Sequence, residues 1–219
     1  MIRGVIFDLD GVLVDAADWH YQALNRSLGL FGYTIDRLDH TENYNGLPTA
    51  LKLSMLSRRT GFPLALHSLV NELKQKYTRE IFLQQCKPHP TLTAALHGLR
   101  KQGLRLAVAS NSSRSTVDLA LQALDIAPYF EAVLSHEDAG IPKPNPAIYH
   151  QTFLRLGLCA QDTLILEDSE PGLRAAYESQ AHVLKIHHPN EVTLENIQKR
   201  IAQITQNSAA PRQPPTIEI

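Results

Sequence analysis

The chain has 219 residues, and its 21 lysine and arginine residues against 22 aspartate and glutamate residues give a formal net charge of -1 at pH 7. The hydrophobic fraction of 43% is typical of a folded globular protein and excludes general disorder. The balanced charge and the 6% of aromatic residues give no electrostatic footprint for nucleic acid. No apolar run is long enough to span a bilayer. We therefore expect neither a nucleic-acid partner nor a membrane partner.

The N-terminal segment and the cysteines indicate a compartment. A short apolar stretch leads directly to Asp8 and Asp10, which leaves no room for a signal peptide. Cys86 and Cys159 are too few for a disulfide framework, and they lack the spacing of a metal site. We therefore expect a cytoplasmic protein with two incidental thiols.

Short apolar runs alternate with amphipathic stretches along most of the chain. The runs typical of strands buried on both faces span 5–7, 104–109, 132–134, 163–166 and 182–186. The stretches with apolar residues at helical spacing include 92–99, 117–124 and 149–156. Such alternation predicts an α/β fold, a Rossmann-like doubly wound parallel sheet with helices on both faces.

The segment 16–87 interrupts this alternation. It has helical patterns, such as 20–30 and 66–82, and no convincing strand. We therefore expect an all-helical cap domain inserted after the first strand, and the two prolines in 87–90 predict an extended linker at its exit. The expected division is a core of 1–15 and 88–206, a helical cap of 16–87, and a C-terminal tail of 207–219.

Polar residues gather where the predicted strands end. They are Asp8 and Asp10 after the first strand, Ser110 and Asn111 after the second, Glu167 and Asp168 after the fourth, and Lys143 in a loop. Ligands of open parallel sheets bind at the carboxyl ends of the strands, so we expect these side chains on one rim. Carboxylates brought together there need a neutralising cation. The candidates are the ammonium of Lys143 and a divalent ion. Because carboxylates offer hard oxygen donors, we expect that ion to be Mg²⁺.

The order of these motifs resembles that of the haloacid dehalogenase-like hydrolase superfamily. Residues 7–15, Phe-Asp-Leu-Asp-Gly-Val-Leu-Val-Asp, are similar to its first motif, and Ser110, Lys143 and Glu167-Asp168 resemble the other three. The helical insertion resembles the small cap of the phosphoglycolate phosphatase and β-phosphoglucomutase branch. The resemblance implies a Mg²⁺-dependent phosphatase that hydrolyses a small phosphorylated metabolite through an aspartyl phosphate. Members with this cap are often monomeric, so we expect a monomer.

The resemblance also implies a role for each motif residue. Asp8 would be the nucleophile, Asp10 would protonate the leaving oxygen and then activate water, and Lys143 would offset negative charge. We expect the neighbouring carboxylates to raise the pKa of Asp10. Ser110 and the backbone of Asn111 would bind phosphoryl oxygens. The metal ligands would be Asp8, the carbonyl of Asp10, and Asp168, with Glu167 either a ligand or a supporting residue.

A loop of the cap bears on the substrate. In β-phosphoglucomutase-like members a loop around a glycine carries an arginine that grips a second phosphate. The similar loop here contains Gly46, a candidate substrate-binding residue, and has Thr49 at the arginine position. The nearest cations, Lys52, Arg58 and Arg59, are displaced along a predicted helix. We therefore expect a substrate with one phosphate, and water as the acceptor.

Two further cap positions allow two interpretations each. His20 lies in a segment that resembles the family's hinge, so it is either a substrate-binding residue or a solvated or capping histidine. Lys76 is either a substrate contact or, as we expect from its neighbours Lys74 and Arg79, part of a solvated helix face.

Two alternative functions stay open. One is a β-phosphoglucomutase-like sugar-phosphate mutase, and the other is a binding protein of the same fold without turnover. Asp10 favours phosphoryl transfer, because the similar motif of dehalogenase members has a tyrosine at this position. The intact set of Asp8, Asp10, Lys143 and Asp168 argues against an inactive protein. The physiological substrate is not encoded in any of these motifs.

Overall fold

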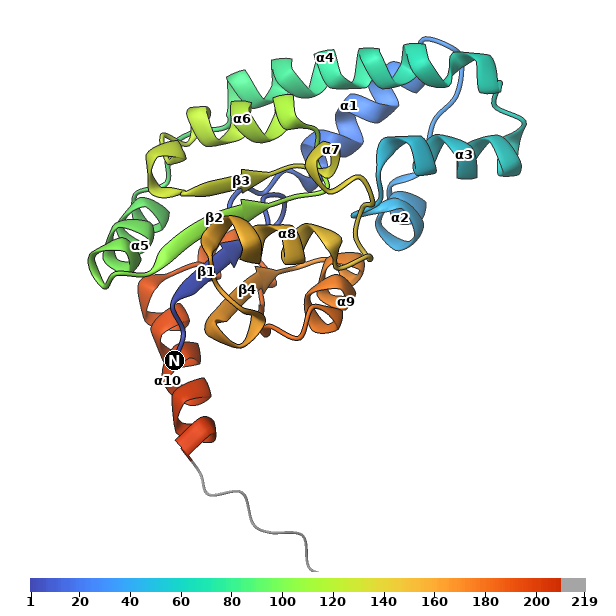
Figure 1. Ribbon diagram of the computed structural model, residues 1–219. Coiled ribbons are helices and arrows are strands. Elements are labelled where there is room, and N and C mark those ends of the chain that lie inside the picture. Colours follow the sequence, from blue (N-terminus) through green and yellow to red (C-terminus); the bar gives the residue numbers. More distant parts are fainter. Residues whose placement is uncertain (210–219) are drawn as a thin grey trace, which may run out of the picture.

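The computed structural model describes residues 1–209, which form a five-stranded sheet flanked by helices, with a helical extension at one end (Figure 1). The strands are β1 Gly4–Phe7, β2 Arg105–Ala109, β3 Ala132–Leu134, β4 Thr163–Glu167 and β5 His182–Lys185. They are paired in parallel in the order β3-β2-β1-β4-β5. The predicted α/β class with a doubly wound parallel sheet is confirmed, and each predicted strand coincides with an observed one to within a residue.

The sheet is apolar because both of its faces are covered. Val5, Ile6 and Phe7 of the central strand are fully buried; Val5 and Phe7 belong to the cluster on one face and Ile6 to the cluster on the other. The first cluster includes residues of α5 Pro90–Lys101, α6 Arg114–Ala123 and α10 Leu194–Ala209. The second includes residues of α8 Ala147–Leu156 and α9 Glu170–Glu178.

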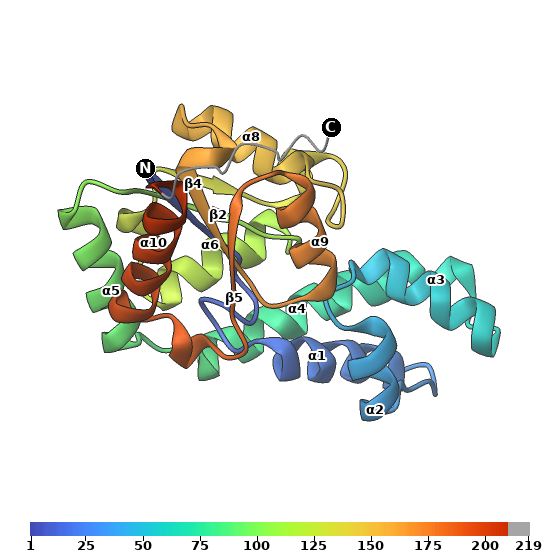
Figure 2. The same cartoon turned by 90° about the horizontal axis from the view of Figure 1, so that it is seen from below.

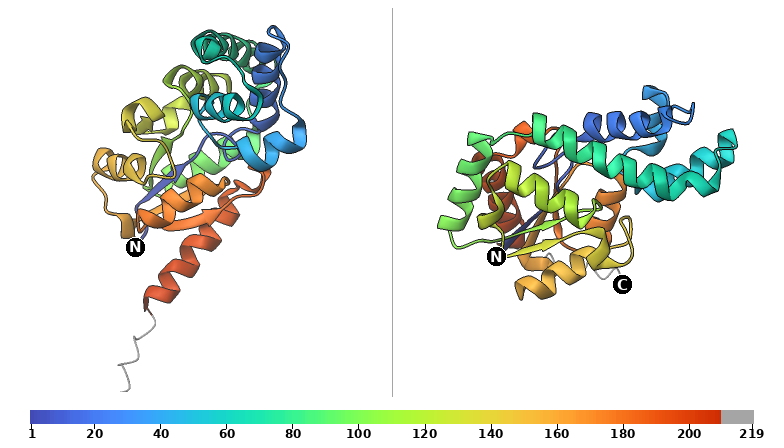
Figure 3. Two further views of the ribbon diagram at one scale, coloured as in Figure 1. Left: turned by 90° about the vertical axis from the view of Figure 1, so that its right-hand side faces the viewer. Right: turned by 90° about the horizontal axis from the view of Figure 1, so that it is seen from above.

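The segment between β1 and α5 forms helices, as expected. They are α1 Ala17–Gly29, α2 Arg37–Asp39, the π-helix His40–Tyr44, α3 Thr49–Thr60, a 3₁₀ turn Leu64–Leu66, and α4 His67–Gln85. Figures 2 and 3 show α1 and α4 side by side, with α4 running from the core out to the tip of the extension. Leu24, Leu28, Leu53 and Val70 belong to a separate hydrophobic cluster among these helices.

Short elements complete the core, and α10 ends the described chain. The short elements are 3₁₀ turns at Ala127–Tyr129, Ala160–Asp162 and Pro189–Glu191, and helix α7 His136–Ala139. Helix α10 continues to Ala209, so the first three residues of the expected tail, 207–209, are helical. The rest of that predicted tail, 210–219, lies outside the described residues. No helix within residues 1–209 is long and apolar enough to cross a membrane.

Candidate active site

The predicted polar residues meet at the carboxyl ends of β1, β2 and β4. Asp8 directly follows β1 and continues the ladder, since its N–H donates to Leu166 O at 3.0 Å. Ser110 does the same after β2 through Leu134 O, also at 3.0 Å. Glu167 is the last residue of β4. The parallel register of the three strands therefore brings these side chains to one rim, as the sequence predicts.

Lys143 enters this rim from the loop between α7 and α8 and is almost fully buried. Its Nζ lies 3.1 Å from Asp8 Oδ1, forms an ion pair with Glu167, and donates to Ala109 O at 2.8 Å. Although burial opposes its charge, these two carboxylates hold the pKa of Lys143 above its ordinary value. Lys143 is therefore a fixed positive charge beside Asp8.

The side chain of Asn111 positions the Lys143 loop. Asn111 Oδ1 accepts from Lys143 N at 2.9 Å, and Asn111 Nδ2 donates to Lys143 O at 3.3 Å. The sequence motif suggested only a backbone role for Asn111. The hydroxyl of Ser110 is buried and accepts from Ser112 N at 3.0 Å, and no acceptor for its own proton lies within residues 1–209. Ser110 is therefore able to donate to a ligand oxygen.

Asp8, Glu167 and Asp168 form a carboxylate cluster whose oxygens lie within 4.8 Å of one another. Within residues 1–209, the buried Asp168 Oδ1 accepts no hydrogen bond, and the buried Asp8 Oδ1 has only the ammonium of Lys143 beside it, at 3.1 Å. Burial and the charge of Glu167 raise the pKa of Asp8 well above its ordinary value, and that of Asp168 to about 7. Buried oxygens with unused lone pairs and no nitrogen or sulfur donor fit a hard divalent cation such as Mg²⁺.

Glu167 differs from the other two carboxylates because protein donors already occupy it. Its Oε1 accepts from Lys143 and from Tyr149 Oη, the latter at 2.7 Å. Its Oε2 accepts from Asp168 N at 3.1 Å and from Ser169 Oγ at 3.3 Å. This occupancy favours the supporting role for Glu167 over the role of a direct metal ligand. No sequence motif indicated a role at the site for Tyr149, which lies on α8, 18 residues before Glu167.

Asp10 points away from the carboxylate cluster toward the cap. Its Oδ1 lies 3.0 Å from His20 Nε2, and its Oδ2 accepts from Ser112 Oγ at 2.6 Å. Burial raises the pKa of Asp10, but His20, Ser112 and the charge of Lys74 outweigh it and lower that pKa to about 2. The expected increase in the pKa of Asp10 is therefore wrong for this arrangement, because its carboxylate faces hydrogen-bond donors and not the other acids.

A cavity of about 450 Å³ lies between this rim and the cap. Its walls include Asp8, Asp10, Ser110 and Lys143 from the core, and His20, Gly46, Thr49, Lys52 and Lys74 from the cap. Both cap candidates of the sequence, His20 and Gly46, therefore reach the site. Gly46 has a φ of 72°, and a Cβ there would lie 3.2 Å from Ser169 Cβ. Glycine therefore suits both the backbone conformation and the tight approach to the core.

The lysines of α4 differ from the expectation. Lys76 is exposed and absent from the cavity wall, as expected, but Lys74 is buried and lines it. Val70, Lys74, Thr78 and Ile81 are all buried on one face of α4. Residues spaced four, four and three apart line one face of a helix. This spacing in the sequence was the signal that could have placed Lys74 on the buried face of α4 and not on its solvated face.

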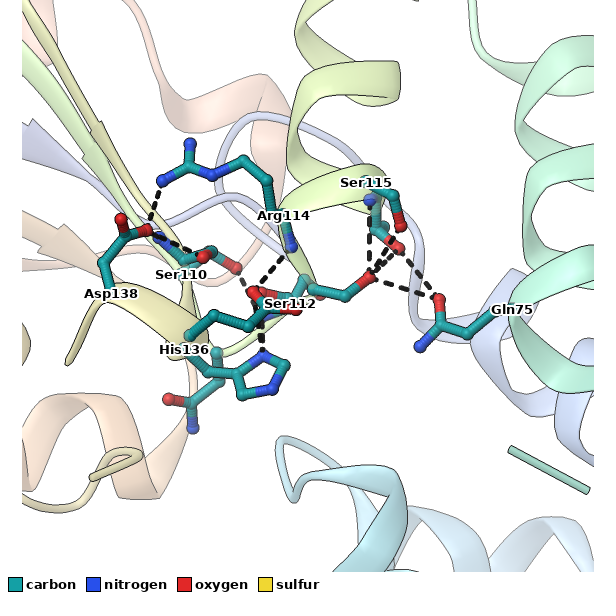
Figure 4. Close-up of polar contacts among 12 residues, drawn as sticks. Gln75, Ser110, Ser112, Arg114, Ser115, His136 and Asp138 are labelled. Carbon is teal, nitrogen blue, oxygen red and sulfur yellow. Dashed lines mark hydrogen bonds and ion pairs between the residues drawn. The ribbon is translucent and has the colours of Figure 1, made fainter. Parts of the chain in front are cut away.

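Polar contacts also join α4 to the core. Gln75 Oε1 accepts from Ser113 Oγ at 3.2 Å and from Thr116 Oγ1 at 3.3 Å. Figure 4 shows Gln75 reaching across from α4 toward this serine-rich start of α6. On the core side, Arg114 forms an ion pair with Asp138. The start of α6 therefore contacts the cap and also lines the cavity.

Comparisons with known proteins place this geometry in a family. A family model described as haloacid dehalogenase-like hydrolase matches residues 5–186, so the chain belongs to the haloacid dehalogenase-like hydrolases. The expected branch, with phosphoglycolate phosphatase and β-phosphoglucomutase, is confirmed, as is the enzyme class of a phosphoric monoester hydrolase.

Individual relatives agree with this assignment. A phosphoglycolate phosphatase of Yersinia pseudotuberculosis is 30% identical over 177 residues, which cover 80% of this chain and 76% of the relative. A phosphorylated carbohydrates phosphatase of Thermotoga maritima is 26% identical over 181 residues, 80% of each protein. The crystal structure of β-phosphoglucomutase from Clostridium difficile has a TM-score of 0.79 at 21% identity, over 94% of this chain and 100% of that one. This last similarity concerns the fold.

Proposed function

We propose that the protein hydrolyses a small phosphorylated metabolite in a Mg²⁺-dependent reaction through an aspartyl phosphate on Asp8. The observation that carries the proposal is the arrangement around Asp8. Its carboxylate lies on the wall of a cavity, 3.1 Å from the buried ammonium of Lys143, with Asp10 on the opposite, cap-facing side. A positioned carboxylate nucleophile, a cation for phosphoryl charge and a separate acid–base group are what this chemistry requires.

In the first step Asp8 attacks phosphorus while the bond to the leaving oxygen breaks, and Asp10 supplies the proton that oxygen needs. Ser110 and the backbone of Asn111 bind phosphoryl oxygens, and Lys143 offsets the charge of the nucleophile and the phosphoryl group. In the second step Asp10 takes a proton from water, which attacks the aspartyl phosphate. The products are inorganic phosphate and free Asp8. The proton that Asp10 gives to the leaving oxygen in the first step is regained from water in the second.

Asp8, Asp168 and the Asp10 carbonyl would hold Mg²⁺. When bound, the ion would neutralise charge on the phosphoryl group and help to orient that group toward the nucleophile. Gly11 supports this arrangement because a Cβ there would lie 2.1 Å from Asp168 Oδ2, so a larger residue would displace that carboxylate. Glu167 holds Lys143 and the backbone that follows β4.

Removal of divalent metal should abolish activity. We expect phosphate release from p-nitrophenyl phosphate to require Mg²⁺ and to stop with chelator. Ca²⁺ should support little turnover, because its looser coordination misplaces the nucleophile and the phosphoryl group. The measurement is p-nitrophenol release by metal-stripped protein to which each ion is returned. Full activity in chelator would refute the metal assignment, and no activity with any ion would favour the inactive binding protein.

Hydrolysis, not mutase action, is the outcome we expect with sugar phosphates. The loop around Gly46 has Thr49 where a mutase-like arginine would stand, and threonine lacks the bidentate fork that orients a phosphate. With β-glucose 1-phosphate and a bisphosphate primer, free phosphate should appear and glucose 6-phosphate should not. Glucose 6-phosphate formed faster than free phosphate, measured in a coupled dehydrogenase assay, would reverse this conclusion.

The remaining expectations belong to the same proposal. We infer a core of 1–15 and 88–206 with a cap of 16–87, since the outer part of the cap helices packs into a hydrophobic cluster of its own, while Trp19 and Phe82 join the cap to the core cluster. We also propose a monomer located in the cytoplasm, with a small phosphorylated metabolite as its partner. These features are consistent with a metabolite phosphatase whose cap supplies substrate specificity.

A further inference from the structure

Two buried lysines of the cap face the proposed phosphoryl site across the cavity. Lys52 lies on α3 and is 8% exposed, and Lys74 lies on α4 and is 9% exposed. Both line the cavity that also contains Asp8. Lysines are rarely buried to this extent unless a negative charge accompanies them.

Neither lysine has a carboxylate partner. Lys52 Nζ lies 3.4 Å from His40 Nε2, and Lys74 Nζ lies 3.1 Å from His20 Nδ1. Within residues 1–209 no carboxylate oxygen lies within 4 Å of either ammonium. Burial and the charge of Lys52 lower the pKa of His40 to about 4, so this histidine is a neutral acceptor. The partners of both lysines therefore orient them without neutralising them.

The charge of Asp10 raises the pKa of both lysines without direct contact. The carboxylate of Asp10 is already hydrogen-bonded to His20 and Ser112. The other charged or titratable groups that face Lys52 are His40, His20 and Lys74. Burial and repulsion from Lys74 lower the pKa of Lys52 to about 7, and burial lowers that of Lys74 to about 8. Neither lysine therefore has a carboxylate of its own in contact, although Asp10 lies on the same cavity wall.

We propose that Lys52 and Lys74 form a second anion subsite, which binds a carboxylate or a second phosphate at the far end of the substrate. The proposal rests on the hydrolysis proposed for the same cavity and names the class of its substrate. If the second anion is a carboxylate, the expectation of a substrate with one phosphate stands; if it is a phosphate, this subsite replaces that expectation. Lys52 lies three residues after Thr49 on α3, hence on the same helix face, and so supplies from the next turn a cation that the loop lacks.

The first test compares substrates that differ at the far end. The probes are glucose 1-phosphate, which has no second anion, 2-phosphoglycolate with a carboxylate, and glucose 1,6-bisphosphate with a second phosphate. We expect kcat/KM for at least one dianionic probe to exceed that for glucose 1-phosphate by about tenfold or more, the value of one or two charge-assisted hydrogen bonds. The favoured probe identifies the carboxylate or the phosphate. Equal values for all three would overturn the proposal.

Matched variants tie that preference to the subsite. Lys52→Met should remove most of the preference, and Lys52→Arg should retain part of it. Lys76→Met, two residues from Lys74 but exposed, is the control and should leave the preference unchanged. Lys52→Met removes a buried charge, so its Tm should equal or exceed that of the parent. A preference that survives Lys52→Met in folded protein would also overturn the proposal.

A binding experiment decides the proposal without turnover. In Asp8→Asn, which cannot form the intermediate, we would titrate 2-phosphoglycolate, glucose 1,6-bisphosphate and glucose 1-phosphate calorimetrically in buffers of different ionisation enthalpy. A bound anion raises the pKa of Lys52, so the favoured dianionic probe should bind with proton uptake beyond that of glucose 1-phosphate, and more weakly as pH rises above about 7. At pH ~6 Lys52 is protonated before and after binding, so the proton uptake that Lys52 contributes should vanish.

The extra uptake should disappear in Asp8→Asn/Lys52→Met. The same uptake for all three probes would count against the subsite. If p-nitrophenyl phosphate and every probe resist hydrolysis, the proposed function fails while this titration still decides the subsite.

Discussion

Asp8→Asn should eliminate turnover and leave a folded protein. Asparagine has nearly the same shape as aspartate but does not attack phosphorus, so we expect kcat to fall by ~10⁴ or more. Lys143 keeps its contacts with Glu167 and Ala109, and the acidic cluster has one charge fewer. In chelator, the Tm should therefore equal or exceed that of the parent.

The measurement is phosphate release from p-nitrophenyl phosphate, with Tm followed by circular dichroism. Mass spectrometry of acid-quenched parent protein should find a phosphoryl adduct on the peptide that contains Asp8, absent from the variant. A variant that keeps a tenth of the parental kcat would exclude the covalent mechanism. Asp15→Asn is a matched control in the same segment, since Asp15 is exposed and lies outside the cavity wall.

The core of the site was predictable because parallel strands impose a simple rule. A residue that directly follows a buried strand lies on the carboxyl rim, so the order of the apolar runs was sufficient to bring Asp8, Ser110 and Glu167 together. Lys143 was harder, because it enters from a loop. Its place followed only from the need for a cation among carboxylates and from the resemblance of its motif.

The cap and the direction of side chains were less predictable. Lys74 has the same residue type as Lys76, and only its place in the buried stripe of α4 distinguishes the two. The orientation of Asp10 depends on His20 and Ser112, which are 10 and 102 residues away in the chain. Contacts of such sequence separation are set by how the cap helices pack against the core, which no local pattern specifies.

Asp10→Asn should slow the formation and the hydrolysis of the aspartyl phosphate by ~10²–10⁴, the usual contribution of general acid–base catalysis. In the free site, Asp10 is ionised because its pKa is lowered to about 2, so it is ready to act as the base of the second step. To act as the acid of the first step it must gain a proton. The negative charge of an incoming phosphate opposes that of Asp10 and favours this gain.

The acid role makes the loss depend on the leaving group. For Asp10→Asn, the defect in phosphorylation measured in single turnovers should be large for alkyl phosphates and small for p-nitrophenyl phosphate, whose leaving group needs no proton. Ser112→Ala is the matched variant: it removes one hydrogen bond to Asp10 but keeps the carboxylate and its contact with His20, so its loss should be about tenfold or less. Equal defects across the leaving-group series would count against Asp10 as the acid, and would restrict its role to the activation of water.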